Sequence, residues 1–133
     1  MFKNFFMFEI CVEHTFAAGH ALRNYHGKCE NVHGHNYRVQ VAIEGRELDE
    51  NGLLYDFVEL KKRLRATSEY LDHQFLNDLQ PFDQINPSAE NIAKFICDEL
   101  QKGLREASIA YVRVWETDTS CAVYRPENLA NRR

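Results

Sequence analysis

The sequence has no long hydrophobic run, and this absence excludes a helical membrane protein. None of its 133 residues lies in an apolar stretch of the roughly 18 residues that a membrane-spanning helix needs. Lys3 and Asn4 interrupt the aromatic N-terminal segment, and Glu9 follows before the apolar core of a signal sequence can form. We therefore expect neither membrane insertion nor secretion.

Cysteine and runs of positive charge are also scarce. Four cysteines are present, and without a secretion signal we expect their thiols to stay free in the reducing cytoplasm. Three of them have apolar neighbours and are expected in the core: Cys11, Cys97 and Cys121. The formal net charge is −4 and no basic run is longer than residues 61–63, so we expect no binding to nucleic acid, which normally requires a basic face.

The hydrophobic pattern predicts a single α+β domain over residues 1–133. Alternation of apolar and polar residues predicts four strands, at about residues 5–16, 35–45, 109–116 and 121–125. Apolar residues at helical spacing predict two helices, one from the N-cap Asp56 to Tyr70 and one from the N-cap Ser88 to Gly103. Segment 17–32 lacks such periodicity and is expected to be a loop, and residues 128–133 are expected to be a frayed tail.

This order of elements predicts a four-stranded antiparallel sheet with both helices on one face. Two helices leave the second face and both edges of the sheet uncovered, and open edges tend to pair with other chains. We therefore expect a homo-oligomer.

Segment 29–35 concentrates side chains that can bind a metal ion, in the motif Cys-x-x-x-His-Gly-His. If the backbone is extended, His33 and His35 point to the same face, and Gly34 leaves room between them. Alternatively, the two histidines are solvated residues of a turn. A catalytic zinc ion uses three protein ligands, and the residues alone leave three upstream candidates for the third: His14, His20 and His26.

Six short motifs, taken together, resemble the 6-pyruvoyl/6-carboxy-tetrahydropterin synthase family over about residues 8–125. In the order of the family they are Phe16-Ala17-Ala18-Gly19-His20, Lys28-Cys29, His33-Gly34-His35-Asn36-Tyr37, Leu71-Asp72-His73, Asn86-Pro87-Ser88-Ala89-Glu90-Asn91 and Trp115-Glu116-Thr117. The short spacer between the cysteine and His-Gly-His is similar to that of the 6-carboxy-5,6,7,8-tetrahydropterin synthases of queuosine and deazapurine biosynthesis. The 6-pyruvoyl enzymes usually have a longer spacer.

The resemblance implies a cytoplasmic, zinc-dependent lyase that converts 7,8-dihydroneopterin triphosphate to 6-carboxy-5,6,7,8-tetrahydropterin, acetaldehyde and triphosphate. A 6-pyruvoyl product is the alternative if the side chain is not cleaved. A third possibility is a structural zinc module without activity, in which Cys29 is a fourth ligand. The separate Asp72-His73 and Glu116 motifs argue against that module, because a structural site has no need of them.

For the metal, the resemblance implies a zinc ion that acts as a Lewis acid on the substrate's side-chain hydroxyls. The ligands that it implies are His20, His33 and His35, since His20 stands in the Phe-x-Ala-x-His context of the family and the other two upstream histidines do not match. Cys29 matches the catalytic cysteine, whose thiolate would move protons on the pterin side chain. Lys28 and a nearby zinc ion would favour that thiolate, whereas an inert loop cysteine is the other possibility.

Asp72 and His73 match the acid/base pair of the family, in which the carboxylate orients and polarises the imidazole. On the residues alone, the pair could merely complement the dipole at the end of a helix. Glu116 matches the pterin anchor, because a carboxylate can accept two hydrogen bonds from the N–H edge of a pterin, although a glutamate at a strand end is usually solvated. Ser88 and Glu90 match pterin contacts, but capping alone explains Ser88.

The resemblance also implies the tunnelling fold, in which the sheets of neighbouring subunits join edge to edge into a barrel. Members are commonly hexamers built as dimers of trimers, with the active site shared between chains. The zinc ion and Cys29 would then belong to one subunit, and Asp72-His73 to its neighbour. No motif identifies the triphosphate site, for which the candidates are Arg23, Lys28 and Arg113.

Overall fold

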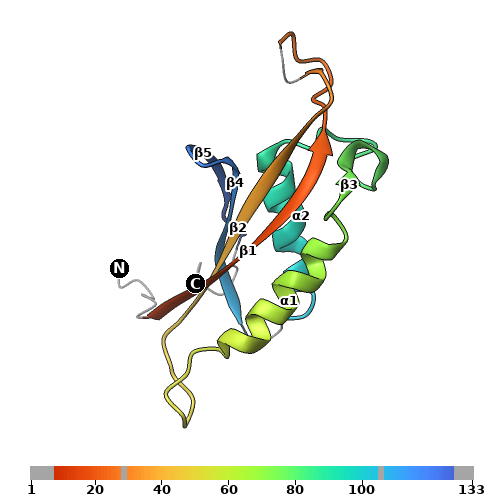
Figure 1. Cartoon of the computed structure of the whole chain (residues 1–133). Helices are drawn as coiled ribbons and strands as arrows, with labels where there is room; N and C mark the ends of the chain where they lie inside the picture. Colours follow the sequence, from red (N-terminus) through yellow and green to blue (C-terminus); the bar gives the residue numbers. More distant parts are fainter. Residues whose placement is uncertain (1–7, 28–29, 105–106, 128–133) are drawn as a thin grey trace, which may run out of the picture.

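Two helices pack against a mixed sheet of five strands in the computed structural model, which describes residues 8–27, 30–104 and 107–127 (Figure 1). The strands are β1 (Phe8–His20), β2 (His33–Gly45), β3 (Gln74–Phe75), β4 (Ser108–Thr117) and β5 (Ser120–Tyr124). The helices are α1 (Phe57–Glu69), α2 (Ala89–Gln101) and a short 3₁₀ helix, η2 (Leu76–Asp78). Within these residues, no helix has the length and apolar composition to cross a bilayer.

The sheet has the strand order β3-β1-β2-β4-β5, with antiparallel pairing from β1 to β5 and parallel pairing of β3 with β1. The four predicted strands and both predicted helices are present. The prediction of a wholly antiparallel, four-stranded sheet is wrong at one edge, where β3 pairs Gln74 with Ala18 and Phe75 with Gly19. A strand of two residues has no periodicity, so the sequence pattern could not reveal it.

The β1–β2 hairpin is longer than predicted. Residues 17–20 were expected to be loop, but β1 continues to His20 and β2 begins at His33, so that these two residues are paired across the ladder. The small residues before His20 do not alternate in hydrophobicity, yet pairing on both sides of the strand supplies their backbone hydrogen bonds. Two histidines that are distant in the sequence are therefore brought opposite each other.

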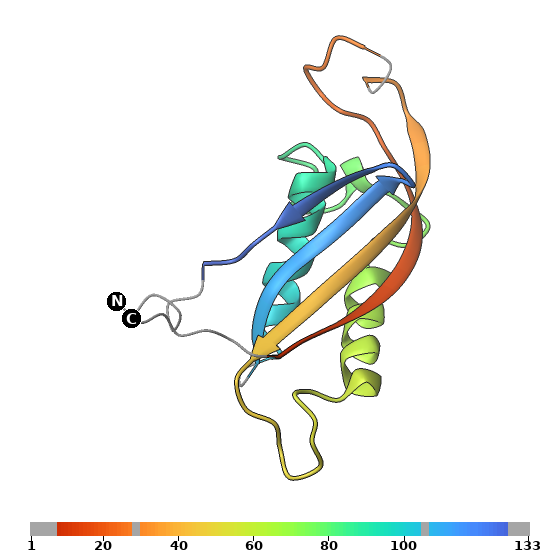
Figure 2. The same ribbon diagram turned by 90° about the vertical axis from the view of Figure 1, so that its left-hand side faces the viewer.

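Both helices cover the same face of the sheet, as predicted, and Figure 2 looks onto the other face with the helices behind it. Helix α1 packs on β1, and α2 packs on β4 and β5. The core between these layers contains alternate residues of the central strands together with one side of each helix: Tyr37, Val39, Val41, Leu60, Leu64, Ile92, Ile96, Val112 and Val114. This packing fixes the sheet on which the site is built.

The second face of the sheet, without helices, carries polar side chains that bind one another. Arg38 lies 3.5 Å above the Trp115 ring and 3.3 Å from Glu13, and Gln40 donates to Glu13 at 2.8 Å. The placement of two cysteines in the core is wrong, because Cys11 and Cys121 are exposed while Cys97 is buried. All three thiols are free, and burial raises the pKa of Cys97 to about 12.

Asp56 caps α1, as predicted, and the cap offers a test of this part of the fold. Its carboxylate accepts a hydrogen bond from the Val58 N–H at 2.8 Å. The substitution Asp56→Ala removes this acceptor and should lower the free energy of unfolding by about 1 kcal/mol in urea denaturation. Asp56→Asn keeps an acceptor oxygen and should retain most of the stability; equal losses in both variants would contradict the capping role.

Candidate metal centre

Three imidazoles meet at the end of the β1–β2 hairpin where the connecting loop joins the two strands. His20 ends β1 and His33 begins β2 directly opposite, while His35 lies two residues further along β2 on the same face. Their ligand-capable nitrogens all lie within 4.8 Å of one another, and His20 is fully buried. The fold therefore brings together the three histidines that the family resemblance selected.

Backbone carbonyls determine which nitrogen of two of these rings carries the hydrogen. His20 Nδ1 lies 2.7 Å from the Pro87 carbonyl, and His33 Nδ1 lies 2.7 Å from the Asn31 carbonyl. A carbonyl only accepts hydrogen bonds, so each Nδ1 is the donor and each neutral ring keeps a lone pair on Nε2. Such a carbonyl contact is also how metal-bound histidines are commonly oriented.

The two Nε2 atoms of His20 and His33 lie 3.0 Å apart. In the tautomers above, both are acceptors and neither can donate to the other. His35 Nε2 is buried as well and has no hydrogen-bond partner among the described residues. Two nitrogen lone pairs and a third imidazole nitrogen thus converge on one place, and this set of three histidines fits a divalent transition-metal ion such as zinc.

The electrostatics of the cluster favour neutral imidazoles. Burial lowers the pKa of His20, an effect that outweighs the hydrogen bond to Pro87 and the charge of Glu116. Burial likewise lowers the pKa of His35. Since a metal binds the unprotonated ring, both shifts favour metal binding.

Glu116 places a negative charge beside the cluster. Its two carboxylate oxygens each lie 3.7 Å from an imidazole nitrogen, one from His20 Nε2 and the other from His35 Nε2. The carboxylate, predicted as a pterin anchor, is therefore also close enough to attract a cation bound by the histidines.

Tyr37 is a component of the site that the sequence reasoning missed. Its hydroxyl lies 3.1 Å from His20 Nδ1, and its ring is fully buried against those of His20 and His35. Burial raises its pKa, so the hydroxyl remains protonated. The strand period of two places Tyr37 on the same face as His35, and this signal could have identified it.

Asp72 and His73 form a pair that is held on the edge of β1. The Asp72 carboxylate lies 3.0 Å from His73 Nδ1 and accepts from the Ala17 N–H at 2.9 Å, while the His73 N–H donates to the Ala17 carbonyl at 2.6 Å. The Ala17 hydrogen bond, followed by that of His73, lowers the pKa of Asp72. The pair is therefore bound to β1, and complementing the dipole of α1 does not explain its position.

The backbone of His73 is unusual, with a φ of 59°. Non-glycine residues seldom adopt this conformation, and it occurs most often where surrounding contacts impose it, frequently at functional sites. The imidazole itself is 81% exposed and so is free to meet a substrate. His73 and His35 both line a shallow hollow of about 460 Å³ at this end of the sheet.

The other predicted residues lie in different places. Cys29 and Lys28 are outside the described residues. Ser88 caps α2 by accepting from the Asn91 N–H at 3.2 Å, and Glu90 is exposed in the first turn of that helix. The upstream histidines not selected by the resemblance, His14 and His26, are not part of the cluster.

Two arginines were candidates for the triphosphate site, and the structure separates them. The Arg23 guanidinium donates to the carbonyls of Phe82 at 2.8 Å and Ile85 at 3.1 Å, which gives it a structural role. Arg113 lies among aromatic rings, 5.3 Å from the centroid of Tyr111 and 5.5 Å from that of Trp115.

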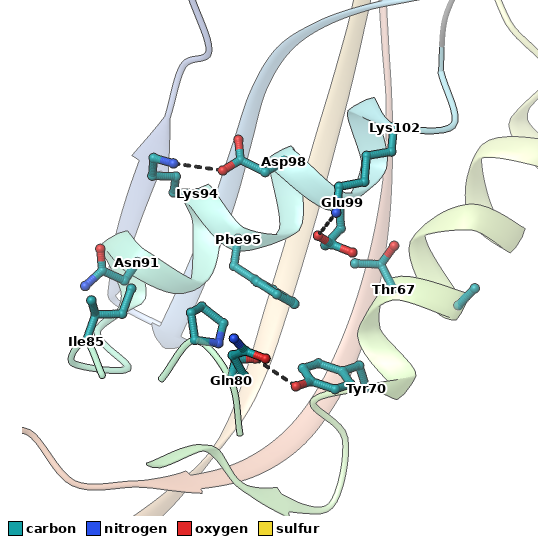
Figure 3. Close-up of a pocket in the computed structure, with 12 residues that line it drawn as sticks. Thr67, Tyr70, Gln80, Ile85, Asn91, Lys94, Phe95, Asp98, Glu99 and Lys102 are labelled. Atoms are coloured by element: carbon teal, nitrogen blue, oxygen red, sulfur yellow. Dashed lines mark hydrogen bonds and ion pairs between the residues drawn. The ribbon is translucent and has the colours of Figure 1, made fainter. Parts of the chain in front are cut away.

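A larger groove, of about 950 Å³, lies between α1 and α2 (Figure 3). Tyr70 and Phe95 stack in it with ring centroids 5.7 Å apart. Its four charged side chains form two ion pairs, Lys94 with Asp98 and Lys102 with Glu99. Among the described residues, none of the predicted catalytic, metal-binding or pterin-binding residues lines the groove.

Comparison with known proteins agrees with the resemblance found in the sequence motifs. Residues 9–127 match the family described as 6-pyruvoyl tetrahydropterin synthase. The chain is 37% identical over 131 residues to 6-carboxy-5,6,7,8-tetrahydropterin synthase of Bacillus subtilis, covering 92% of this chain and 88% of that protein. It is 38% identical over 105 residues to 6-pyruvoyl tetrahydrobiopterin synthase of Homo sapiens, covering 76% and 72%. The solved structure of 6-pyruvoyl tetrahydropterin synthase from Caenorhabditis elegans superimposes with a TM-score of 0.77 at 26% identity, over 92% of this chain and 99% of that chain.

A substitution in the cluster tests the metal site. His33→Ala removes one of three converging nitrogens and should weaken zinc binding by more than about a hundredfold. This loss exceeds the roughly 10–100-fold that is typical when a residue hydrogen-bonded to a metal ligand is changed. The measurement is a competition titration against a chromogenic chelator. His26→Ala changes an exposed histidine outside the cluster and should bind zinc like the wild type; undiminished binding by the His33 variant would refute the assignment.

Proposed function

Because the chain belongs to the 6-pyruvoyl tetrahydropterin synthase family, we propose that it is a zinc-dependent lyase acting on 7,8-dihydroneopterin triphosphate. Its products are 6-carboxy-5,6,7,8-tetrahydropterin, acetaldehyde and triphosphate, a reaction of queuosine and deazapurine biosynthesis in the cytoplasm. The observation that carries this proposal is the convergence of the His20, His33 and His35 nitrogens beside Glu116. Such an open set of three ligands suits a catalytic metal better than a closed structural one.

Each group of residues has a distinct task in this proposal. Zinc bound by the histidines would polarise the side-chain hydroxyls of the substrate and lower their pKa. The Cys29 thiolate accepts and returns protons at the pterin side chain. Asp72 holds His73 through Nδ1, which leaves the exposed Nε2 of His73 to exchange a proton with the substrate.

Pterin binding is assigned to the carboxylate of Glu116, whose two oxygens can accept from the N–H edge of the ring. Ser88 and Glu90 follow the Pro87 carbonyl that orients His20, and we assign them secondary contacts with the pterin. The Ser88 hydroxyl would have to make this contact while it accepts the hydrogen bond from the Asn91 N–H.

Two observations favour the 6-carboxy product over the 6-pyruvoyl alternative. The cysteine spacer is of the short kind, Cys-x-x-x-His-Gly-His. The Bacillus subtilis relative matches 92% of this chain, whereas the human relative matches 76%. Their identities, 37% and 38%, do not separate the two products, so the proposal rests mainly on the spacer.

Product analysis tests this assignment. The zinc-loaded protein, incubated with 7,8-dihydroneopterin triphosphate, should release acetaldehyde and triphosphate in equal amounts, as measured by mass spectrometry and by derivatisation of the aldehyde. Triphosphate with a 6-pyruvoyl product and no acetaldehyde would establish the alternative. The absence of both products would refute a synthase of either kind.

We further propose that the chain assembles into a hexamer, as a dimer of trimers, through the edges of its sheet. On the face without helices, Glu13 binds Arg38 and Gln40, and Gln40 also accepts from the Tyr111 hydroxyl. The edges are less protected, because in the part of the chain that the structure describes β3 pairs with two residues of β1 and β5 pairs with β4 alone.

Subunit exchange tests whether the site is shared between chains. In a shared site, Cys29→Ala and His73→Ala oligomers are each inactive, but mixed oligomers contain some sites with both native halves and should regain activity. The variants are dissociated, reassembled together, verified by native mass spectrometry and assayed for turnover. Mixed oligomers without activity would place Cys29 and His73 of the same chain in one site, for which the hollow lined by His35 and His73 provides a location.

The metal content of these variants serves as a control. Each should retain zinc, because neither substitution removes a nitrogen of the cluster. Loss of zinc from Cys29→Ala alone would instead identify Cys29 as a fourth ligand and support a structural zinc module.

A further inference from the structure

The chain leaving β1 after His20 is bound by two asparagine side chains from a distant segment. Asn77 accepts from the Ala21 N–H at 2.9 Å and donates to the Ala21 carbonyl at 2.8 Å. In the same way, Asn86 accepts from the Arg23 N–H at 2.8 Å and donates to the Arg23 carbonyl at 2.9 Å. Each amide thus satisfies both backbone groups of one residue.

This pattern continues the edge of the sheet beyond the last residue of β3. In a ladder, a neighbouring strand bonds both backbone groups of every second residue on its side. Strand β3 pairs with Ala18 and Gly19, and the amides of Asn77 and Asn86 then take the alternate residues Ala21 and Arg23. The backbone around His20 is therefore held by β2 on one side. On the other side it is held by β3, Asn77 and Asn86.

The turn that contains Asn86 also holds the His20 ring. The carbonyl of Pro87 accepts from His20 Nδ1, and the carbonyl of Asn86 accepts from the side chain of Asn91 at 2.9 Å. Asn91 lies in the first turn of α2, so the helix, the turn and the residues after His20 form one connected set of hydrogen bonds. A shift of the Asn86 backbone would move the Pro87 carbonyl and change the orientation of the imidazole.

We propose that Asn77 and Asn86 are positioning residues of the metal centre, which fix the His20 imidazole in the Nδ1–H tautomer and aim its Nε2 at the metal. Among side chains of this length, only an amide can bind both backbone groups of one residue, because it has an acceptor and a donor at its tip. A carboxylate would keep the bond to the N–H group but would oppose the carbonyl oxygen. The inference rests on the metal site proposed above.

The variants Asn77→Asp and Asn86→Asp test this role, because each replaces the amide NH2 with an oxygen, which removes the donor and adds a negative charge. In each, the zinc dissociation constant should rise about 10–100-fold, the range found when groups that orient a metal ligand are changed. The matched control is Asn51→Asp, the same chemical change at an exposed residue of the loop before α1. A second control, Leu64→Ala, opens a cavity in the core and lowers stability without touching these hydrogen bonds.

A second measurement does not require the metal. Long-range ¹H–¹⁵N correlation spectra of the metal-free protein distinguish the two tautomers of a histidine. Wild type, Asn51→Asp and Leu64→Ala should all show His20 as the Nδ1–H form, whereas Asn86→Asp and Asn77→Asp should show a mixture of both forms. A purely structural role would lower stability in the asparagine variants, as Leu64→Ala does, without changing the tautomer.

The outcomes separate this inference from the proposed function. If wild type binds zinc and the folded asparagine variants bind it equally well with His20 in one tautomer, the positioning role is refuted while the metal site stands. If wild type itself fails to bind zinc, the metal site is refuted and this inference with it. If one asparagine variant does not fold, the other decides by the same two measurements; if neither folds, the role is structural and the inference fails.

Discussion

The site depends on one constraint, which is that two imidazole nitrogens present their lone pairs to the same place. His20 and His33 donate through Nδ1 to carbonyls, and their Nε2 atoms face each other at 3.0 Å. Neither can satisfy the other, and a buried acceptor without a donor costs free energy. The arrangement persists because the pairing of the two histidines in the β1–β2 ladder and the Pro87 and Asn31 carbonyls over-determine it. A single cation bound between them could satisfy both nitrogens at once.

Much of the metal centre could be predicted from the sequence, because strand geometry alone places His33 and His35 on one face. The choice of His20 came from the family resemblance and not from the pattern, since residues 17–20 show no alternation and were expected to be loop. Their strand conformation arises from pairing with β2 and β3, and such tertiary contacts are not encoded in local periodicity. The prediction of the α1 and α2 caps succeeded because an N-cap is a local feature of a few residues.

The longest-range features of the site were the least predictable. Asp72 and His73 were recognised as a pair, but their attachment to Ala17 spans more than fifty positions of sequence and has no local signal. Asn77 had no predicted role, yet its amide replaces a strand beside Ala21. In both cases a side chain binds the backbone of a residue in β1 or directly after it, far away in the sequence. The sequence pattern of neither segment records the contact.

Strand β1 connects these features, because its two backbone edges serve different purposes near its end. One edge forms the ladder with β2 that aligns the histidines, and the other binds Asp72, His73 and β3 at residues 17–19. In the described part of the chain, residues 8–16 of β1 have no strand on that second side. If sheets of neighbouring subunits join edge to edge, we therefore expect the first half of β1 to pair with the free edge of β5 in the next chain. Such a contact joins two different surfaces, so it closes into a ring when repeated by a rotation. The same strand would then support the metal ligands, the acid/base pair and the subunit interface.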